Sequence, residues 1–231
     1  MSKLDEKRMI DDIKLLSLDM IQNAGSGHPG ICLSAAPMIY TLFANHMVYD
    51  IDRPEWCNRD RFVLSAGHGS ALLYATIYAT TGDFSIDDLK KYRHINSQTP
   101  GHPELNIKKR IEATTGSLGQ GFATAVGMAI AEKHLESKYN TKKLTLFNYN
   151  TYCLCSDGDL MEGISYEAAS LAGEYKLNNL IVLYDANKMT LDGALDKDYN
   201  EKIANMYAAL DWCVLTVKNG DKLSEINKAL E

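Results

Sequence analysis

The sequence lacks the features of a membrane or exported protein. It contains no apolar run long enough to span a bilayer, and its start, Met1–Arg8, is charged and has no signal-peptide core. The five cysteines are odd in number and show no C-x-x-C spacing, which disfavours a disulfide scaffold and a zinc site. Repeats, low-complexity tracts and Ser/Gly linkers are also missing. We therefore expect a cytoplasmic protein with no membrane partner and a single domain over residues 1–231.

A basic excess is missing as well. The chain carries 24 Lys and Arg against 30 Asp and Glu, a net charge of -6, which argues against nucleic-acid binding. Any bound anion must then be held by local geometry, through backbone amides, a metal ion or histidine. With 231 residues, of which 45% are hydrophobic, the chain is long enough for one large α/β domain.

Short apolar runs alternate with helical patterns along the chain. Strands are predicted at Arg61–Ser65, Thr151–Cys155, Leu180–Asp185 and Cys213–Val217. Continuous apolar strands separated by helices are typical of a parallel sheet that is covered on both sides. The sequence therefore predicts an α/β fold, an open and mostly parallel sheet with helices on both faces.

The expected helices include an N-terminal one, in which apolar residues recur at helical spacing from Met9 to Met20 and which stops at Gly25. A second is predicted from about Ser34 to Met47. A third begins near Glu162, after a turn at residues 156–159.

Two polar residues follow neighbouring strands of this sheet. Asp157 comes directly after one strand and Asn187 after the next, so both are expected at the carboxyl edge where α/β sheets bind ligands. Their oxygens, with the Met189 carbonyl, would suit Mg²⁺ or Ca²⁺. Gly158 allows close approach of an anion, and the following helix points free amides at it. An Asp-Gly turn or a helix cap is the simpler interpretation of each residue taken alone.

Three of the six histidines, His28, His68 and His102, follow a glycine in loops stiffened by Gly or Pro. A lone loop histidine is more often a surface residue than a catalyst, but three in rigid loops favour a placed role in binding or proton transfer. A further Gly-rich loop, Thr115–Gly121, opens a helix. Taken alone, it is as well explained by close helix packing.

Residues 156–168, continued through 180–187, resemble the thiamine diphosphate signature of the transketolase family. The loops at 26–30, 65–70, 99–104 and 115–121 also resemble transketolase loops. The resemblance therefore covers nearly the whole chain in order, and it implies a thiamine diphosphate-binding fold.

The resemblance assigns roles around the metal ion. Asp157, Asn187 and the Met189 carbonyl would bind the metal, and the Gly158 amide would contact the diphosphate. Glu162 would join a carboxylate cluster at a subunit interface.

It also assigns roles around the cofactor rings and the substrate. His68 would contact the diphosphate, Gly116 and Leu118 would lie against the cofactor rings, and Leu191 would lie near the thiazolium. His28 and His102 would face the first hydroxyl groups of a sugar and move protons there.

The implied reaction is transfer of a two-carbon ketol unit between sugar phosphates, as in the pentose phosphate pathway. It requires a glutamate from a pyrimidine-binding domain, which no part of this chain resembles. That domain would come from a longer chain or a separate subunit, in a homodimer or heterotetramer. We expect the chain alone to be inactive, and its end within a helix beginning near Lys222 predicts a domain that is incomplete there.

Two departures and two alternatives accompany this interpretation. Ser156 stands where the family usually has glycine, which would cost about 1 kcal/mol if the position needed a positive φ. Ser117 stands where proline is common, and we expect looser preorganisation there. The alternatives are another thiamine diphosphate enzyme, such as a dihydroxyacetone or deoxyxylulose phosphate synthase, and a non-catalytic binding or pairing module.

Overall fold

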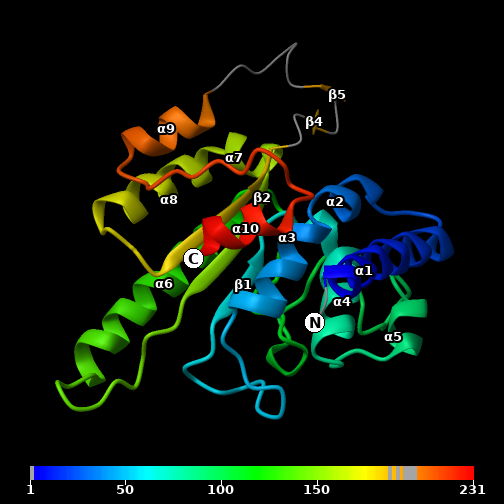
Figure 1. The fold of residues 1–231 in the computed structure, drawn as a ribbon, viewed down its shortest axis with the longest axis horizontal. Helices are drawn as coiled ribbons and strands as arrows, with labels where there is room; N and C mark the ends of the chain where they lie inside the picture. The colour runs from blue at the N-terminus through cyan, green and yellow to red at the C-terminus, as the bar shows by residue number, and fades with distance from the viewer. Residues whose placement is uncertain (1–2, 187–188, 191–192, 195–201) are drawn as a thin grey trace.

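The computed structural model describes residues 3–186, 189–190, 193–194 and 202–231. Its centre is a parallel three-stranded sheet in the order β1-β2-β3, with β1 at Arg61–Leu64, β2 at Thr151–Ser156 and β3 at Leu180–Asp185 (Figure 1). A short antiparallel pair, β4 (Met189–Thr190) and β5 (Gly193–Ala194), follows β3. The predicted parallel sheet is confirmed.

Alternate side chains of these strands enter two separate cores. Phe62 and Tyr152 belong to the core on one face of the sheet, whereas Val63, Cys153 and Cys155 belong to the core on the other. Because successive strand residues point to opposite faces, a strand that is apolar throughout must be covered on both. The expectation of helices on both faces is therefore confirmed (Figure 1).

The first face is covered by the helices of the N-terminal half. These helices are α1 (Lys3–Ala24), α2 (Pro29–Ser34), α3 (Ala36–Thr41), the π-helix η1 (Leu42–His46), α4 (Ser70–Thr80) and α5 (Ile86–Lys90). In α1, Ile13 and Met20 are buried and Met9 packs against the same core, as the helical spacing predicts. The helix ends at Gly25, whose φ of 65° supplies the expected left-handed cap.

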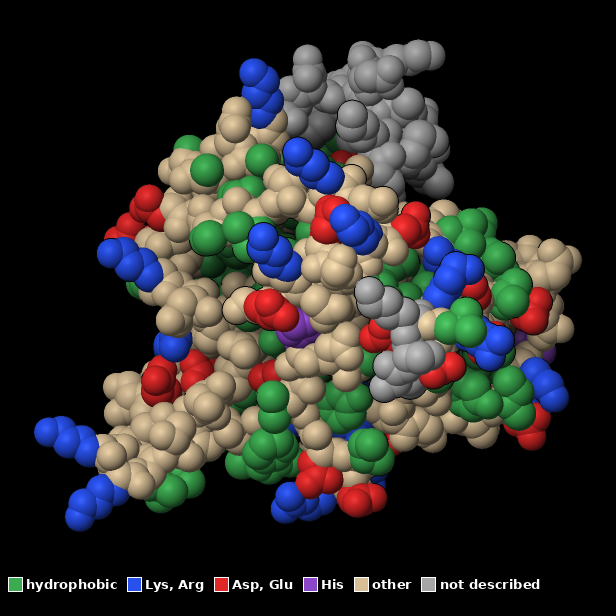
Figure 2. All heavy atoms as spheres, viewed as in Figure 1, with side chains coloured by type: hydrophobic (Ala, Val, Ile, Leu, Met, Phe, Trp, Pro, Cys, Tyr) green, Lys and Arg blue, Asp and Glu red, His purple; other side chains and the backbone are tan. Residues whose placement is uncertain are grey.

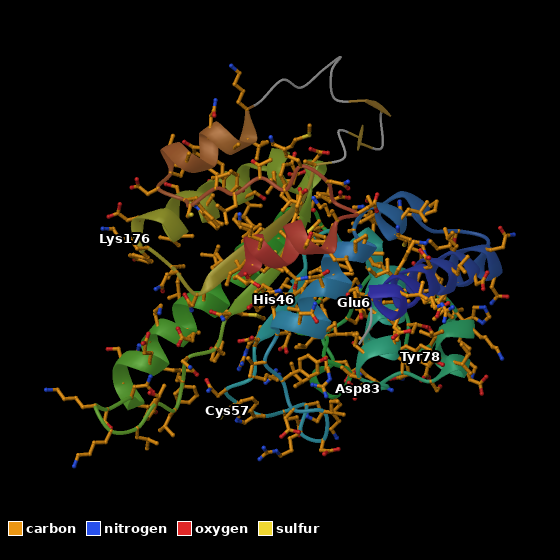
Figure 3. The ribbon with its side chains drawn as sticks, in the orientation of Figure 1. Glu6, His46, Cys57, Tyr78, Asp83 and Lys176 are labelled. Carbon is orange, nitrogen blue, oxygen red and sulfur yellow. The ribbon has the colours of Figure 1, made fainter. Side chains whose placement is uncertain are left out.

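The second face is covered by later helices. These are α6 (Gln120–Tyr139), α7 (Asp157–Met161), α8 (Gly163–Glu174) and α9 (Ile203–Ala209). The remaining elements are the 3₁₀ turns η2 (Gly67–Gly69) and η3 (Ile107–Lys109), and the helix α10 (Leu223–Leu230). The helix α10 packs on α3 and η1, where the His46 ring nitrogen lies 2.8 Å from Asn227 Oδ1 (Figure 3).

Two local predictions about helices need correction. The helix expected from Ser34 begins earlier, because Pro29 suits the first helical turn, and it breaks at Ala35 into shorter pieces. The expected turn at 156–159 is instead the start of α7, so the helix that was placed from Glu162 is preceded by another. The helix expected from near Glu162 is confirmed as α8, which begins at Gly163 with Glu162 as its N-cap.

The predicted strand Cys213–Val217 is wrong. The segment is irregular, and Leu215 is 64% exposed. Apolar, β-branched sequence favours a strand only when a neighbouring strand accepts its hydrogen bonds, and within the described part of the chain none pairs with it.

On the face shown in Figure 2, basic and acidic side chains are interspersed over most of the surface. Within the described residues, no helix is both long and apolar enough to cross a membrane.

Candidate functional site

The carboxyl edge of the sheet carries the polar residues that the sequence singles out. The register pairs Leu64 with Leu154 and Ser156 with Asp185, so the loops after all three strands leave the sheet at the same edge. The loop after β1 carries His68, α7 begins after β2 with Asp157, and Asp185 ends β3. Open α/β sheets bind ligands at this edge.

Asp157 is 4% exposed and has an incomplete set of hydrogen bonds. Its Oδ1 accepts a hydrogen bond from the Tyr184 hydroxyl, whereas its Oδ2 is buried and has no hydrogen-bond partner among the residues that the structure describes. A buried carboxylate oxygen without a donor is unfavourable unless a cation lies against it. Asp157 therefore fits a metal ligand.

The other expected ligands are only partly described. Asn187 lies outside the described residues, and so does Leu191, which the resemblance places near the thiazolium and not at the metal. Met189 begins β4, whose backbone lies against α7, the helix that starts with Asp157. Within the described residues, no group of three or more His, Cys, Asp or Glu side chains gathers as a metal cluster.

The three histidine loops lie together. The rings of His28 and His68 are in edge-to-face contact, with centroids 5.1 Å apart. His102 lies across the Gly-rich loop: a Cβ added to Gly116 would sit 3.3 Å from the His102 ring. Gly116 has a φ of 149°, which disfavours any side chain there.

The loop Thr115–Gly121 joins these parts. A Cβ on Gly67, next to His68, would lie 2.8 Å from the Gly116 nitrogen, and one on Gly158 would lie 3.2 Å from Leu118 Cδ1. This loop therefore touches the His68 loop, the His102 loop and the first turn of α7. Six of the predicted residues form one cluster: His28, His68, His102, Gly116, Leu118 and Gly158.

Burial and mutual repulsion keep these histidines neutral. Burial lowers the pKa of His28, and Arg93 and His102 lower it further. Burial is also the main cause of the lowered pKa of His68, and the nearby His28 lowers this pKa further. The carboxylates of Asp159 and Asp185 act in the opposite direction and raise it. The pKa of His102 is lowered by burial and then by Arg93. Neutral imidazoles can accept as well as donate a proton near pH 7.

Asp159 organises the site, although the sequence interpretation does not single it out. It is fully buried, and its Oδ1 accepts hydrogen bonds from Ser65 Oγ at 2.7 Å and from the Gly119 amide at 3.0 Å. Its Oδ2 accepts from the amide and the hydroxyl of Ser156, both at 2.9 Å. The Asp159 carboxylate is therefore hydrogen-bonded to the loop after β1, to the Gly-rich loop and to the start of α7.

These contacts explain the serine at position 156. Its φ is -114°, so the position needs no positive φ and serine carries no backbone strain. Ser156 and Asp159 instead form a capping box, a spacing of three residues that is readable in the sequence. Ser117 is exposed and its carbonyl accepts from the Gln120 amide at 3.3 Å.

Glu162 lies between α7 and α8. It is exposed and forms the N-cap of α8, and its Cβ would be 2.9 Å from a Cβ on Gly119. Glu162 therefore lies next to Gly119 of the Gly-rich loop, with its side chain exposed to solvent. Asp185, in contrast, is buried and accepts a hydrogen bond from Ser34 Oγ at 2.6 Å, which links the end of β3 to the helix that follows His28.

A parallel α/β sheet with rigid polar loops at its carboxyl edge defines a ligand-binding domain of the cofactor-binding type. The family model "Transketolase, thiamine diphosphate binding domain" matches residues 5–231. The chain therefore belongs to the transketolase family.

Individual relatives agree with this assignment. The chain is 52% identical over 226 residues to a transketolase of Bacillus subtilis, covering 98% of this chain and 34% of that protein. A solved transketolase from Leishmania mexicana superposes with a TM-score of 0.93 at 42% identity, covering 97% of this chain and 34% of that one. A Pichia stipitis transketolase in complex with sedoheptulose-7-phosphate gives 0.93 at 39% identity, covering 97% and 33%. The chain thus spans about a third of the length of these relatives.

Proposed function

We propose that this chain binds the diphosphate end and the metal ion of thiamine diphosphate, in a protein that transfers a two-carbon ketol unit between sugar phosphates. The observation that carries the proposal is the buried Oδ2 of Asp157 at the carboxyl edge of the sheet, which has no hydrogen-bond partner in the described part of the chain. Magnesium or calcium would satisfy that oxygen, since both prefer carboxylate and carbonyl ligands. The match to a thiamine diphosphate binding domain supports the cofactor.

The roles of the other residues are those that the resemblance to the family implies. Asn187 and the Met189 carbonyl would complete the metal site, and the Gly158 amide and His68 would hold the diphosphate. Leu118, Gly116 and Leu191 would border the rings of the cofactor, which when bound would supply the electron sink for C–C bond cleavage. His28 and His102 would donate and accept protons at the sugar hydroxyl groups, because a lowered pKa leaves them neutral.

The site also needs residues from outside this chain. A pyrimidine-binding domain with an activating glutamate would come from a longer chain or a separate subunit, in a homodimer or heterotetramer. The exposed apolar side chains of Ile164 and Tyr166, next to Glu162, offer a surface for such a partner. We place the protein in the cytoplasm and in the pentose phosphate pathway.

Relatives favour this reaction over the alternatives. The matches described above are transketolases, which favours ketol transfer over a dihydroxyacetone or deoxyxylulose phosphate synthase. A pairing-only module has no physical need for a buried Asp157 whose Oδ2 lacks a hydrogen-bond partner among the described residues.

Calorimetric titration with thiamine diphosphate and Mg²⁺ tests the binding. We expect metal-dependent binding that Asp157→Ala weakens by about tenfold or more, because a metal ligand is lost. Asp87→Ala, on the exposed surface of α5, is the matched control and should bind like the parent chain. Equal binding in the presence of a chelator, or binding unaffected by Asp157→Ala, would contradict the proposal.

An activity assay tests the need for a second domain. The chain alone should not turn over xylulose 5-phosphate with ribose 5-phosphate, because the activating glutamate is outside it. Measurable turnover by purified residues 1–231 would show that no further domain is required.

A further inference from the structure

The turn that leads into α10 carries an asparagine followed directly by a glycine. In this sequence Asn219 is the only asparagine with glycine after it. Both residues are exposed, and neither belongs to the site described above. The turn is closed by the Lys222 amide, which donates to the Asn219 carbonyl at 3.0 Å. The pair is therefore open to water in the folded chain.

The side chain of Asn219 is folded over the backbone that follows it. Its Oδ1 accepts a hydrogen bond from the Asp221 amide at 3.0 Å, which makes an Asx turn. The ring that this hydrogen bond closes contains both Cγ of Asn219 and the Gly220 nitrogen, so the two atoms are held in one compact turn. A hydrogen bond to Oδ1 also draws electron density from Cγ, which makes that carbon a better electrophile.

The Gly220 nitrogen is available as a nucleophile for that carbon. Among the residues that the structure describes, its amide donates to no acceptor, whereas the amides of Asp221 and Lys222 both do. A Cβ placed on Gly220 would meet no atom within 4 Å, so the space beside the peptide is open. Neither a hydrogen bond nor a side chain therefore hinders the approach of the nitrogen to Cγ.

Asn58 shows the contrast within the same chain. It is exposed as well, but Arg59 follows it and crowds the peptide nitrogen. Its side chain is also tied to a distant segment, because Asn58 Nδ2 donates to Asn148 Oδ1 at 2.9 Å and Asn58 Oδ1 accepts from the Asn148 amide at 2.8 Å. These contacts hold the Asn58 side chain on Asn148.

We propose that Asn219 is a site of spontaneous deamidation. The Gly220 nitrogen forms a bond to Cγ of Asn219, the Cγ–Nδ2 bond breaks, and the Gly220 amide proton leaves with the side-chain nitrogen as ammonia. The product is a cyclic succinimide, which water opens at either carbonyl carbon. Opening gives aspartate, or isoaspartate in which the main chain runs through Cβ and Cγ. Water is the only co-reactant, and nothing is oxidised or reduced.

The isoaspartyl product should loosen the start of α10. The Asn219 amide donates to Glu225 Oε2 at 3.3 Å, and Asp221 lies 3.8 Å from Lys14 of α1, so the turn links α10 to its own first turn and to α1. A methylene added to the main chain displaces these groups from one another. Because α10 packs on α3 and η1 (Figure 1), we expect its hydrogen bonds to open more often in the deamidated protein.

Peptide mass spectrometry of the protein, as its gene encodes it, tests the site after storage in warm, mildly alkaline buffer. The peptide that contains Asn219 should gain the mass difference between an amide and an acid. It should also accept a labelled methyl group from an isoaspartyl methyltransferase, which detects isoaspartate. The peptide that contains Asn58, taken from the same sample, is the internal control and should stay unchanged.

Gly220→Ala tests the attacking nitrogen. The φ of Gly220 is not in the left-handed region and a Cβ there meets no atom, so alanine should keep the turn. Its methyl group crowds the nitrogen, and the loss of the Asn219 amide should slow by about tenfold or more. Equal rates in Gly220→Ala and the parent, or an Asn219 peptide as unchanged as the Asn58 peptide, overturns the proposal. If Gly220→Ala does not fold, as judged by its thermal unfolding, the comparison of the two peptides decides.

Amide hydrogen exchange tests the effect on α10. The stored parent should exchange faster over α10 than the fresh parent, whereas Gly220→Ala stored in the same way should not change. Asn219→Asp carries the new charge without the longer main chain and should resemble the fresh parent. Equal exchange over α10 in fresh and fully deamidated protein overturns the inferred loosening of this helix.

Discussion

At the residue scale, the site depends on buried polar groups whose hydrogen bonds come from distant parts of the chain. Asp159 is the clearest case, because four neutral donors from Ser65, Gly119 and Ser156 surround one carboxylate. Removing that carboxylate would leave each donor buried without an acceptor. Buried polar networks are stabilising only when they are complete.

We expect Asp159→Ala to lower the free energy of unfolding by about 3 kcal/mol, because the buried donors lose their acceptor. Urea denaturation measures the change. Asp87→Ala is the control, since this side chain is 78% exposed and should change stability by less than about 0.5 kcal/mol. Equal stability of Asp159→Ala and the parent would show that the network contributes nothing.

The histidines predict a dependence of stability on pH. Burial lowers the pKa of His28, His68 and His102 in the folded chain, whereas the unfolded chain titrates near 6.5. Below that value the unfolded state binds more protons, so the free energy of unfolding falls as the pH drops toward the folded pKa values. The urea midpoint should be higher at about pH 7.5 than at about pH 5.5. His68→Gln should reduce this difference, and a midpoint that rises on acidification would contradict it.

At the element scale, glycines decide how closely the loops meet. Gly119 has a φ of 77° and caps α6, and a Cβ there would lie 2.7 Å from Ser165 Oγ and 2.9 Å from Ile164 Cγ2. Gly127, in the middle of the same helix, has open space around it. Replacing Gly119 and replacing Gly127 should therefore change the stability of the chain in opposite directions.

We expect Gly119→Ala to destabilise the chain by about 2 kcal/mol, from left-handed backbone strain and overpacking against α8. Gly127→Ala should instead stabilise it by about 0.5 kcal/mol, because alanine favours the helical backbone. Chemical denaturation of both variants measures the contrast. A gain in stability from Gly119→Ala would mean that the α6–α8 contact is looser than described.

At the scale of the whole molecule, a buried ion pair connects the segment before β1 to the segment before the Gly-rich loop. Arg59 Nη2 lies 2.8 Å from Glu112 Oε2, and Arg59 Nε lies 3.1 Å from Oε1. Both side chains are less than 10% exposed, at 7% and 6%. Burial raises the pKa of Glu112 more than Arg59 lowers it, so removal of water outweighs the attraction.

Arg59→Met should lower the free energy of unfolding by about 3–5 kcal/mol, because it leaves Glu112 buried without its partner. The double variant Arg59→Met with Glu112→Leu should recover most of this loss, since two apolar side chains replace two buried charges. Urea denaturation of the single and double variants gives the coupling. A double variant as unstable as the single one would refute the argument.

The sequence alone determined the parts of the fold that depend on local pattern. The three strands, the Gly25 cap and the polar residues after β2 follow from periodicity and turn chemistry, which neighbouring residues set. The capping box of Ser156 and Asp159 could also be read from its spacing. The strand expected at 213–217 failed because pairing, and not composition, makes a strand.

Only the tertiary structure decided how these parts meet. Ser65 and Asp159 are 94 residues apart in the sequence, and Gly119 and Asp159 are 40 apart, so no local pattern records their hydrogen bonds. The position of the Gly-rich loop between the histidine loops and Asp157 likewise depends on packing around the sheet. Long-range contacts of this kind depend on the folded backbone, which brings distant residues together and excludes water from between them.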